Sequence, residues 1–126
     1  MTKAARLAAR RRGRWAERLA ACWLIAKGYR ILARNLRTPF GEIDLIARRG
    51  RLLALVEVKA RIDRATALEA LRPMQQQRIA RAGAWYVAAR PKLQAFDVRC
   101  DLMIVPAWRR PVHFADAWRR LDRFSP

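Results

Sequence analysis

The stretch from Gly41 to Arg61 constrains the fold more than any other part of the chain. It reads GEIDLIARRGRLLALVEVKAR. Apolar and polar residues alternate at its start, and residues 52–58 form an apolar run typical of a central strand. Between them, Gly50 suits the left-handed position of a three-residue hairpin loop. The stretch therefore predicts two strands joined by a tight, basic turn.

Charged side chains interrupt this apolar hairpin. Because successive side chains of a strand point to opposite faces, Glu57 and Lys59 share one face, roughly 7 Å apart, and Val56 and Val58 take the other. One interpretation is a solvated ion pair near a strand end. The other is that Glu57 and Asp44, on the preceding strand, converge on a hard divalent cation with Lys59 beside it, because Mg²⁺ prefers carboxylate oxygens.

The charge of the chain indicates a polyanionic partner. It has 28 Lys and Arg residues against 10 Asp and Glu residues, which gives a formal net charge of +18 over 126 residues. Such a chain repels itself unless it meets a polyanion, so nucleic acid is the expected partner, with DNA ahead of RNA. A genome rich in G and C would explain why arginine replaces lysine, but not the excess of positive charge.

Turn residues and hydrophobic periodicity divide the chain into elements. Residues 1–12 are expected to form a basic N-terminal arm, and residues 13–126 a single domain. Within this domain the pattern predicts a helix over residues 14–27 ended by Gly28, a strand over 29–35, a loop over 35–40, the hairpin, a helical turn near 65–71, a helix over 74–89, a strand over 96–105, a strand or turn at 112–114 and a helical turn within 115–123. This order is typical of an α/β fold with a mixed central sheet flanked by helices.

The cysteines and the single histidine point to structural roles. Cys22 and Cys100 are isolated and lack the spacing of a zinc site or a disulfide framework, so a reducing cytoplasm is the expected setting. No segment approaches the roughly 20 apolar residues that span a bilayer, so no membrane partner is expected. His113 is expected to be structural, and Asp97 and Asp101 are expected to pair with Arg99 or neighbouring arginines.

Several motifs together resemble a known family. Residues 41–47 and 56–61, with GRWAE at 13–17, GYRILARN at 28–35 and HFADAW at 113–118, are similar to the YraN-like family of small bacterial proteins. That family is grouped with the PD-(D/E)xK nuclease superfamily, which includes archaeal Holliday-junction resolvases. The resemblance runs from about Gly13 to Trp118. It implies a restriction-endonuclease-like core of order α-β-β-β-α-β, and hence a nuclease-like domain over residues 13–126.

The resemblance also implies an activity, magnesium-dependent endonuclease. Asp44, Glu57 and the Val58 carbonyl would bind Mg²⁺ or Mn²⁺, and Lys59 would orient a water molecule or stabilise the pentavalent phosphate. In the family, the acid of the first helix points towards the metal site. For Glu17 the competing interpretation is an ion pair with one of the arginines within reach, Arg14, Arg18 or Arg37.

The start of the second long helix completes the implied site. In the superfamily a lysine or glutamine there faces the catalytic carboxylates, so Gln75 is the best match and Gln76 the second. Many family members also carry a lysine at this point, where this chain has Met74.

Substrate contacts are expected from arginines. We expect arginines around the site to hold the phosphate backbone, namely Arg37, Arg48, Arg49, Arg51 and Arg61. Because phosphate contacts carry little sequence information, cleavage is expected to be structure-selective or nonspecific. The alternative function is a non-catalytic basic DNA- or RNA-binding module on the same fold. Resolvase-like relatives often work as dimers, so a homodimer is a candidate assembly.

Overall fold

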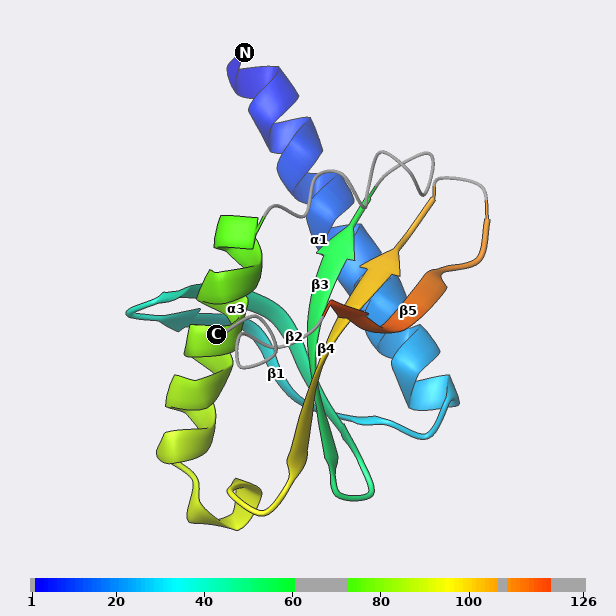
Figure 1. The fold of residues 1–126 in the computed structure, drawn as a ribbon. Helices are drawn as coiled ribbons and strands as arrows, with labels where there is room; N and C mark the ends of the chain where they lie inside the picture. The colour runs from blue at the N-terminus through cyan, green and yellow to red at the C-terminus, as the bar shows by residue number, and fades with distance from the viewer. Residues whose placement is uncertain (1, 61–72, 107–108, 119–126) are drawn as a thin grey trace.

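A mixed five-stranded sheet lies between two long helices (Figure 1). The structure is a computed structural model that describes residues 2–60, 73–106 and 109–118, and the side chains of residues 8–12 and 118 are not described. The elements are α1 (Lys3–Ala26), β1 (Arg30–Thr38), β2 (Gly41–Arg49), β3 (Leu52–Lys59), α3 (Pro73–Ala88), the short 3-10 helix η1 (Pro91–Leu93), β4 (Asp97–Ile104) and β5 (Val112–Trp118). The predicted mixed α/β architecture is confirmed.

The strand order follows the chain order, β1-β2-β3-β4-β5. β3 pairs in parallel with β4, and the other three pairings are antiparallel. The parallel pair needs a long crossover, and α3 lies in it. β3 therefore has a neighbour on each side, which is why its apolar run from Leu53 to Val56 is buried on both faces.

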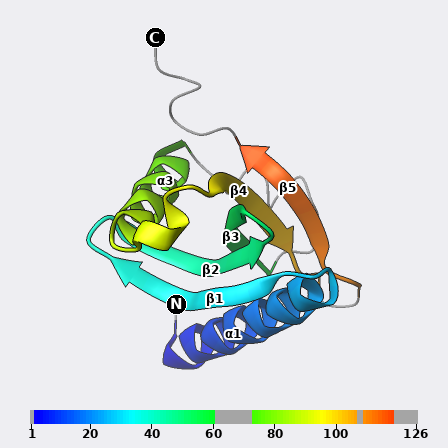
Figure 2. The same ribbon diagram turned by 90° about the horizontal axis from the view of Figure 1, so that it is seen from below.

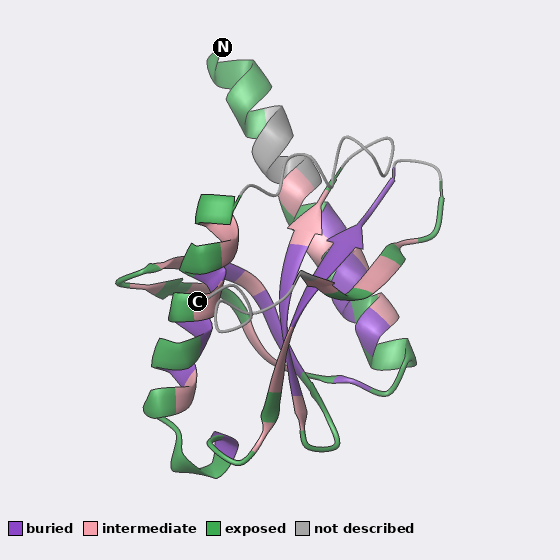
Figure 3. Ribbon diagram, viewed as in Figure 1, coloured by how far each residue is buried: buried purple, intermediate pink, exposed green. Residues whose placement is uncertain are grey.

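Each helix covers one face of the sheet (Figure 2). Ala16, Ala20 and Leu24 of α1 pack on one face against a cluster that includes Leu45 and Val56. On the other face, α3 packs through Ile79, Ala82 and Tyr86. Buried residues accordingly concentrate in β3, β4 and the inner sides of both helices (Figure 3). The site residues must lie at the margins of these two cores.

α1 begins at Lys3, so the prediction of a basic arm followed by a helix from residue 14 was wrong about where the helix starts. Thr2 caps the helix, since its Oγ1 accepts a hydrogen bond from the Ala5 N–H at 3.0 Å. Alanine, leucine and arginine in the first turns are strong helix formers, and one glycine at position 13 costs only about 1 kcal/mol. Gly28, with φ +94°, ends the helix as predicted.

β1 is longer than predicted, because residues 35–38 belong to the strand and only Pro39 and Phe40 form the turn into β2. Its faces also differ from the prediction that Ile31 and Ala33 point the same way. A bulge between these two residues shifts the register, so that Ile31 packs with α1 while Leu32 and Ala33 pack on the α3 side.

The β2–β3 turn is one residue shorter than predicted. Arg49 pairs with Leu52, which leaves the two residues Gly50 and Arg51 in the loop. Gly50 has the predicted positive φ, +61°, and a glycine at the first position of a two-residue loop fits the twist of a hairpin.

The second half of the chain matches the prediction except at its edges. α3 and β4 lie where expected, but Ala84 and Trp85, predicted on the buried side of the helix, are exposed, and Gly83 packs against Leu55 instead. Residues 115–118 form part of β5, not a helical turn, because this segment pairs with β4. The helical turn predicted near 65–71, and residues 119–123, lie outside the described residues. No helix among the described residues is long and apolar enough to cross a membrane.

Candidate functional site

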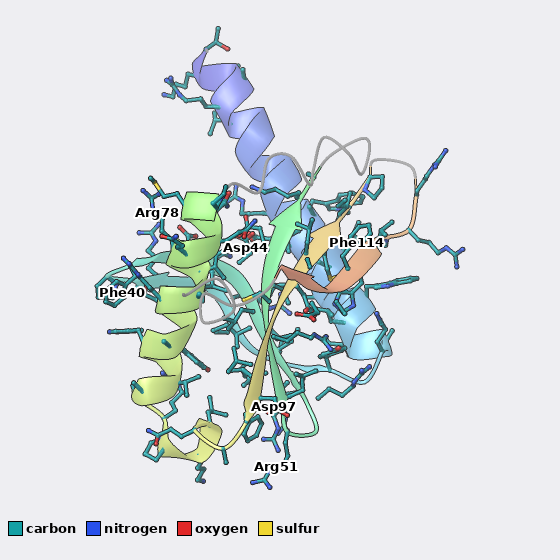
Figure 4. The ribbon with its side chains drawn as sticks, in the orientation of Figure 1. Phe40, Asp44, Arg51, Arg78, Asp97 and Phe114 are labelled. Carbon is teal, nitrogen blue, oxygen red and sulfur yellow. The ribbon has the colours of Figure 1, made fainter. Side chains whose placement is uncertain are left out.

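The candidate site forms where β2 and β3 separate. Their backbone pairing ends at Leu45 and Val56, so Asp44 and Glu57 are the first residues beyond the ladder. Beyond the ladder, the Asp44 side chain replaces a backbone partner of β3, because its Oδ2 accepts a hydrogen bond from the Val58 N–H at 2.8 Å. Figure 4 shows Asp44 well away from Arg51, which marks the opposite end of the hairpin. The opening of the ladder places a carboxylate directly beside β3.

Glu57 lies at the centre of a small polar cluster. It is only 7% exposed, and its Oε1 lies 3.3 Å from the Lys59 Nζ. The same oxygen accepts a hydrogen bond from the Gln75 Nε2 at 3.2 Å. The predicted pairing of Glu57 with Lys59 on one face is therefore present, but the pair is partly buried and not solvated. Gln75, at the start of α3, lies where the resemblance places it.

The environment of Glu57 disfavours its charge. Burial, and next the charge of Asp44, raise the pKa of Glu57 from 4.5 to about 8, although Lys59 opposes the shift. A carboxyl with this pKa keeps its proton at neutral pH. Lys59 therefore does not offset the burial of Glu57 and the charge of Asp44 in the metal-free protein.

Glu17 extends the acidic cluster from α1. Burial, and next the charge of Asp44, raise the pKa of Glu17, while a hydrogen bond with the Asn35 side chain lowers it. Asp44, Glu42 and Asn35 are thus the polar neighbours of Glu17. The interaction with Asp44 is consistent with the expectation from the resemblance, and no ion pair in the described part of the chain joins Glu17 to Arg14, Arg18 or Arg37.

Glu17 and Glu57, the two acids with raised pKa values, both lie beside Asp44. Whether a metal ion fits there depends on the donor atoms that these residues offer. Among residues 2–60, 73–106 and 109–118, no group of three or more His, Cys, Asp or Glu side chains is arranged to hold a metal ion. The predicted donor set is smaller, namely the carboxylates of Asp44 and Glu57 with the Val58 carbonyl. All are hard oxygen donors, and a divalent cation would stabilise the ionised form of Glu57, which burial and the charge of Asp44 disfavour.

The arginines expected to hold phosphate do not gather around these carboxylates. Arg37 pairs with Glu42 in the β1–β2 ladder and lies near the site, and Arg61 lies outside the described residues. Arg48, Arg49 and Arg51 occupy the far end of the hairpin, so the prediction that they surround the site was wrong. These arginines are close to Asp44 and Glu57 in the sequence. In the structure, the eight-residue strand β3 has the arginines at its start and Glu57 near its end, so the two groups lie apart.

A basic residue that the prediction missed lies on the site side of α3. A Cβ placed at Gly41 would lie 3.5 Å from the Cβ of Arg78, so this arginine packs against the start of β2 (Figure 4). The helix start at Gln75 was recognised in the sequence. Arg78 follows Gln75 by three residues, and residues three apart lie on the same side of a helix, so this spacing could have identified it.

A second buried charge, Asp101, has a structural role. It is 0% exposed and accepts two hydrogen bonds from the Arg99 guanidinium, at 2.8 and 2.7 Å, and one from the Asp116 N–H at 2.9 Å. The His113 Nε2 lies 2.7 Å from its Oδ2. Burial alone would raise its pKa, but the hydrogen bonds with His113, Arg99 and Asp116 outweigh it, and the pKa of Asp101 is lowered. The predicted pairing with Arg99 and the structural role of His113 are consistent with these contacts.

A pocket of about 560 Å³ lies between α3 and β4, apart from the carboxylates. Its walls are mostly apolar and contain neither a carboxylate nor a lysine. The residues that line it are Leu55, Ala80, Arg81, Ala84, Val87, Ala88, Gln94, Phe96, Val98 and Cys100. Hydrolytic chemistry is therefore better supported at the Asp44–Glu57 cluster than in this pocket.

Comparison with known proteins identifies the family. Residues 16–105 match the family described as "Uncharacterised protein family UPF0102". The chain belongs to the UPF0102 family. A UPF0102 protein of Paramagnetospirillum magneticum is 53% identical over 116 residues, which cover 89% of this chain and 90% of that relative. A UPF0102 protein of Maricaulis maris is 51% identical over 118 residues, covering 94% and 92%. The YraN-like family expected from the motifs is therefore confirmed for this UPF0102 protein.

Proposed function

We propose that this UPF0102 protein is a divalent-metal-dependent endonuclease. The observation that carries the proposal is the meeting of Asp44 and Glu57 at the opening of the β2–β3 ladder, with Lys59 3.3 Å from Glu57. A buried carboxyl with a raised pKa beside a lysine, such as Glu57, is more typical of catalytic sites than of a fold's ordinary ion pairs. The elements α1, β1, β2, β3, α3 and β4 follow the order α-β-β-β-α-β. This is the order of the restriction-endonuclease-like core that the motifs imply, and it supports the proposal.

Mg²⁺ or Mn²⁺, held by Asp44, Glu57 and the Val58 carbonyl, would supply a Lewis acid for the phosphodiester and a nucleophilic water at neutral pH. The chain's own groups provide the rest. Lys59 stabilises negative charge on the phosphate oxygens, because its ammonium lies beside Glu57 and stays partly exposed. Gln75 orients Glu57 through its amide hydrogen bond.

Glu17 has a positioning role in this proposal. It is half-buried and lies close enough to Asp44 for the two charges to interact. From there it accepts a hydrogen bond from a water molecule beside Asp44 and keeps that water aligned with the phosphate.

Nucleic acid is the proposed substrate, and DNA the first form to test. The net charge of +18 draws a polyanion to the protein, and Arg37 and Arg78 lie on the site side of the molecule. Side chains that contact phosphates do not read bases, so cleavage selective for structure or without sequence preference is the expected outcome.

The test is cleavage of labelled duplex, single-stranded and four-way-junction DNA in Mg²⁺, Mn²⁺ or EDTA. Wild type is compared with Glu57→Gln and, as a matched control, with Glu42→Gln, an exposed acid on the neighbouring strand. Metal-dependent cutting that is lost in Glu57→Gln and kept in Glu42→Gln supports the proposal. Cutting that survives Glu57→Gln would place the chemistry elsewhere.

A second candidate is a basic nucleic-acid-binding module without catalysis. The observation that favours it is Met74, which is 66% exposed at the position where many family members carry a lysine. Tight binding without cutting under every metal condition would select this candidate.

A further inference from the structure

The end of the β2–β3 hairpin carries a second group of basic residues, which is separate from the carboxylates and extends over both faces of the hairpin. Arg48 and Arg49 end β2, and Arg51 lies in the turn. We call these three residues the hairpin-end arginines. All three are exposed, and Arg51 directly precedes β3. Glu57 lies six residues further along, so at about 3.3 Å per residue the two Cα atoms are roughly 20 Å apart.

Aromatic rings hold two of these arginines in place. The Arg48 guanidinium lies 4.9 Å from the centre of the Phe96 ring and donates a hydrogen bond to the Gly50 carbonyl at 3.1 Å. The Arg49 guanidinium lies 4.5 Å from the centre of the Tyr29 ring and donates to the Lys27 carbonyl at 3.3 Å. Stacking of this kind fixes a guanidinium without neutralising it. The charges are therefore positioned before any ligand arrives.

Carboxylates do not neutralise these guanidinium groups. In the described part of the chain, the carboxylates of the ion pairs are those of Glu57 and Asp101, and neither pairs with a hairpin-end arginine. Asp97 is the acid beside the turn, and its backbone N–H donates to the Arg51 carbonyl at 3.0 Å. A solvated basic turn is the ordinary explanation for one exposed arginine. Three arginines within four residues, two of them fixed by stacking, favour a binding role.

Further basic residues lie at the same end of the molecule. η1 contains Lys92, and the segment after it returns through Phe96, the ring beneath Arg48. Arg90 stacks over Tyr86 at 3.7 Å in the same way. In Figure 1 the hairpin turn and η1 both lie at the end of the sheet away from the tip of β3. The positive charge therefore extends from the turn to the end of α3.

We infer that the hairpin-end arginines form a non-catalytic phosphate-binding surface that holds the substrate on one side of the cleavage site. This inference rests on the proposed function, because it assigns the flank of the same substrate to this surface. A duplex rises about 3.4 Å per base pair, so roughly 20 Å corresponds to about six base pairs. The substrate class is therefore a duplex arm that extends at least about six base pairs from the scissile phosphate, and not a nucleotide or short oligomer.

The experiment measures binding of a fluorescent 24-base-pair DNA duplex in EDTA over a series of salt concentrations, so that cleavage does not enter. Arg48→Gln/Arg51→Gln is compared with Arg18→Gln/Arg81→Gln, which removes the same charge from exposed positions on α1 and α3. The hairpin-end variant is expected to raise Kd at least about tenfold and to lower the slope of log Kd against log salt by about 2, and the control to change neither.

Arg51→Gln alone guards against a folding defect, because Arg51 lies in the turn and stacks on no aromatic ring among the described residues. It is expected to lower the slope by about 1. Equal losses in both double variants would show that binding follows net charge alone and would overturn the inference, as would an unchanged slope in the hairpin-end variants.

Cleavage data separate this inference from the proposed function. If the wild type cleaves but the hairpin-end variants bind as tightly as the wild type, the inference fails and the nuclease stands. If the hairpin-end variants lose binding as expected and the wild type never cleaves, the phosphate-binding surface stands and the nuclease fails.

Discussion

Replacing Glu57 by glutamine is expected to stabilise the metal-free protein at neutral pH. The pKa of Glu57 is raised from 4.5 to about 8, first by burial and then by the charge of Asp44. A carboxyl whose pKa is higher in the folded than in the unfolded chain stabilises the fold below pH 4.5, and this contribution disappears as the pH rises to 8. At about 1.4 kcal/mol per pH unit, the loss at pH 7 reaches about 3 kcal/mol.

Glutamine has nearly the same shape and does not ionise, so the variant escapes this loss. Because Glu57 keeps its proton at pH 7, the variant gives up only the hydrogen bond between Lys59, whose side chain is 18% exposed, and the neutral carboxyl, and this costs about 1 kcal/mol. The expected net gain at pH 7 is about 2 kcal/mol, which corresponds to an increase in Tm of several degrees. At pH 4.5 the two proteins are expected to be of similar stability.

The assay is urea and thermal unfolding in EDTA at pH 4.5, 7 and 8. Glu42→Gln is the control, since it removes an exposed acid from β2 and is expected to change stability by less than about 0.5 kcal/mol. Added Mg²⁺ is expected to stabilise the wild type at pH 7 and to have little effect on Glu57→Gln. A Glu57→Gln variant that is less stable than the wild type at pH 7 in EDTA would refute the argument that burial and the charge of Asp44 raise the pKa of Glu57.

Three further changes test other parts of the structure. Lys59→Ala is expected to abolish metal-dependent cleavage and leave the salt dependence of DNA binding nearly unchanged, because affinity comes mainly from arginines; a parallel loss of binding and folding would instead indicate a structural lysine. Asp101→Asn is expected to cost about 3 kcal/mol in urea unfolding at pH 7, since it weakens a buried ion pair. The lowered pKa of Asp101 stabilises the fold above pH 3.8 and is lost as the pH falls below that value, so the variant should also lose stability less steeply in acid; an unchanged acid transition would exclude this role. Gly83→Val is expected to cost about 3 kcal/mol because its Cβ would overlap Leu55, whereas Ala84→Val on the exposed side should cost about 0.5 kcal/mol, and equal effects would contradict the packing.

Much of the local structure could be predicted from the sequence alone. Alternation along β3 placed Glu57 and Lys59 on one face, and the apolar run between Leu52 and Val58 indicated a central strand. Gly50 marked the hairpin turn. These features follow from side-chain periodicity and backbone sterics within a few residues, so no distant contact was needed to predict them.

Other features depended on single insertions or caps that periodicity does not reveal. The bulge after Ile31 reversed the expected face of Ala33, since one extra residue shifts every later side chain. The start of α1 at Lys3 followed from the Thr2 cap and from the helix-forming residues after it, which outweighed the repulsion among its arginines.

The candidate site depends on both the sequence and the tertiary structure. The sequence determined which residues can act, because two strands of opposite direction carry Asp44 and Glu57 and the resemblance implied Glu17 and Gln75. Only the tertiary structure decided that these side chains meet, since that depends on where the β2–β3 ladder ends and how α1 and α3 pack on the two faces. It also separated the hairpin-end arginines from the carboxylates, because residues close in sequence lie far apart when a strand runs between them.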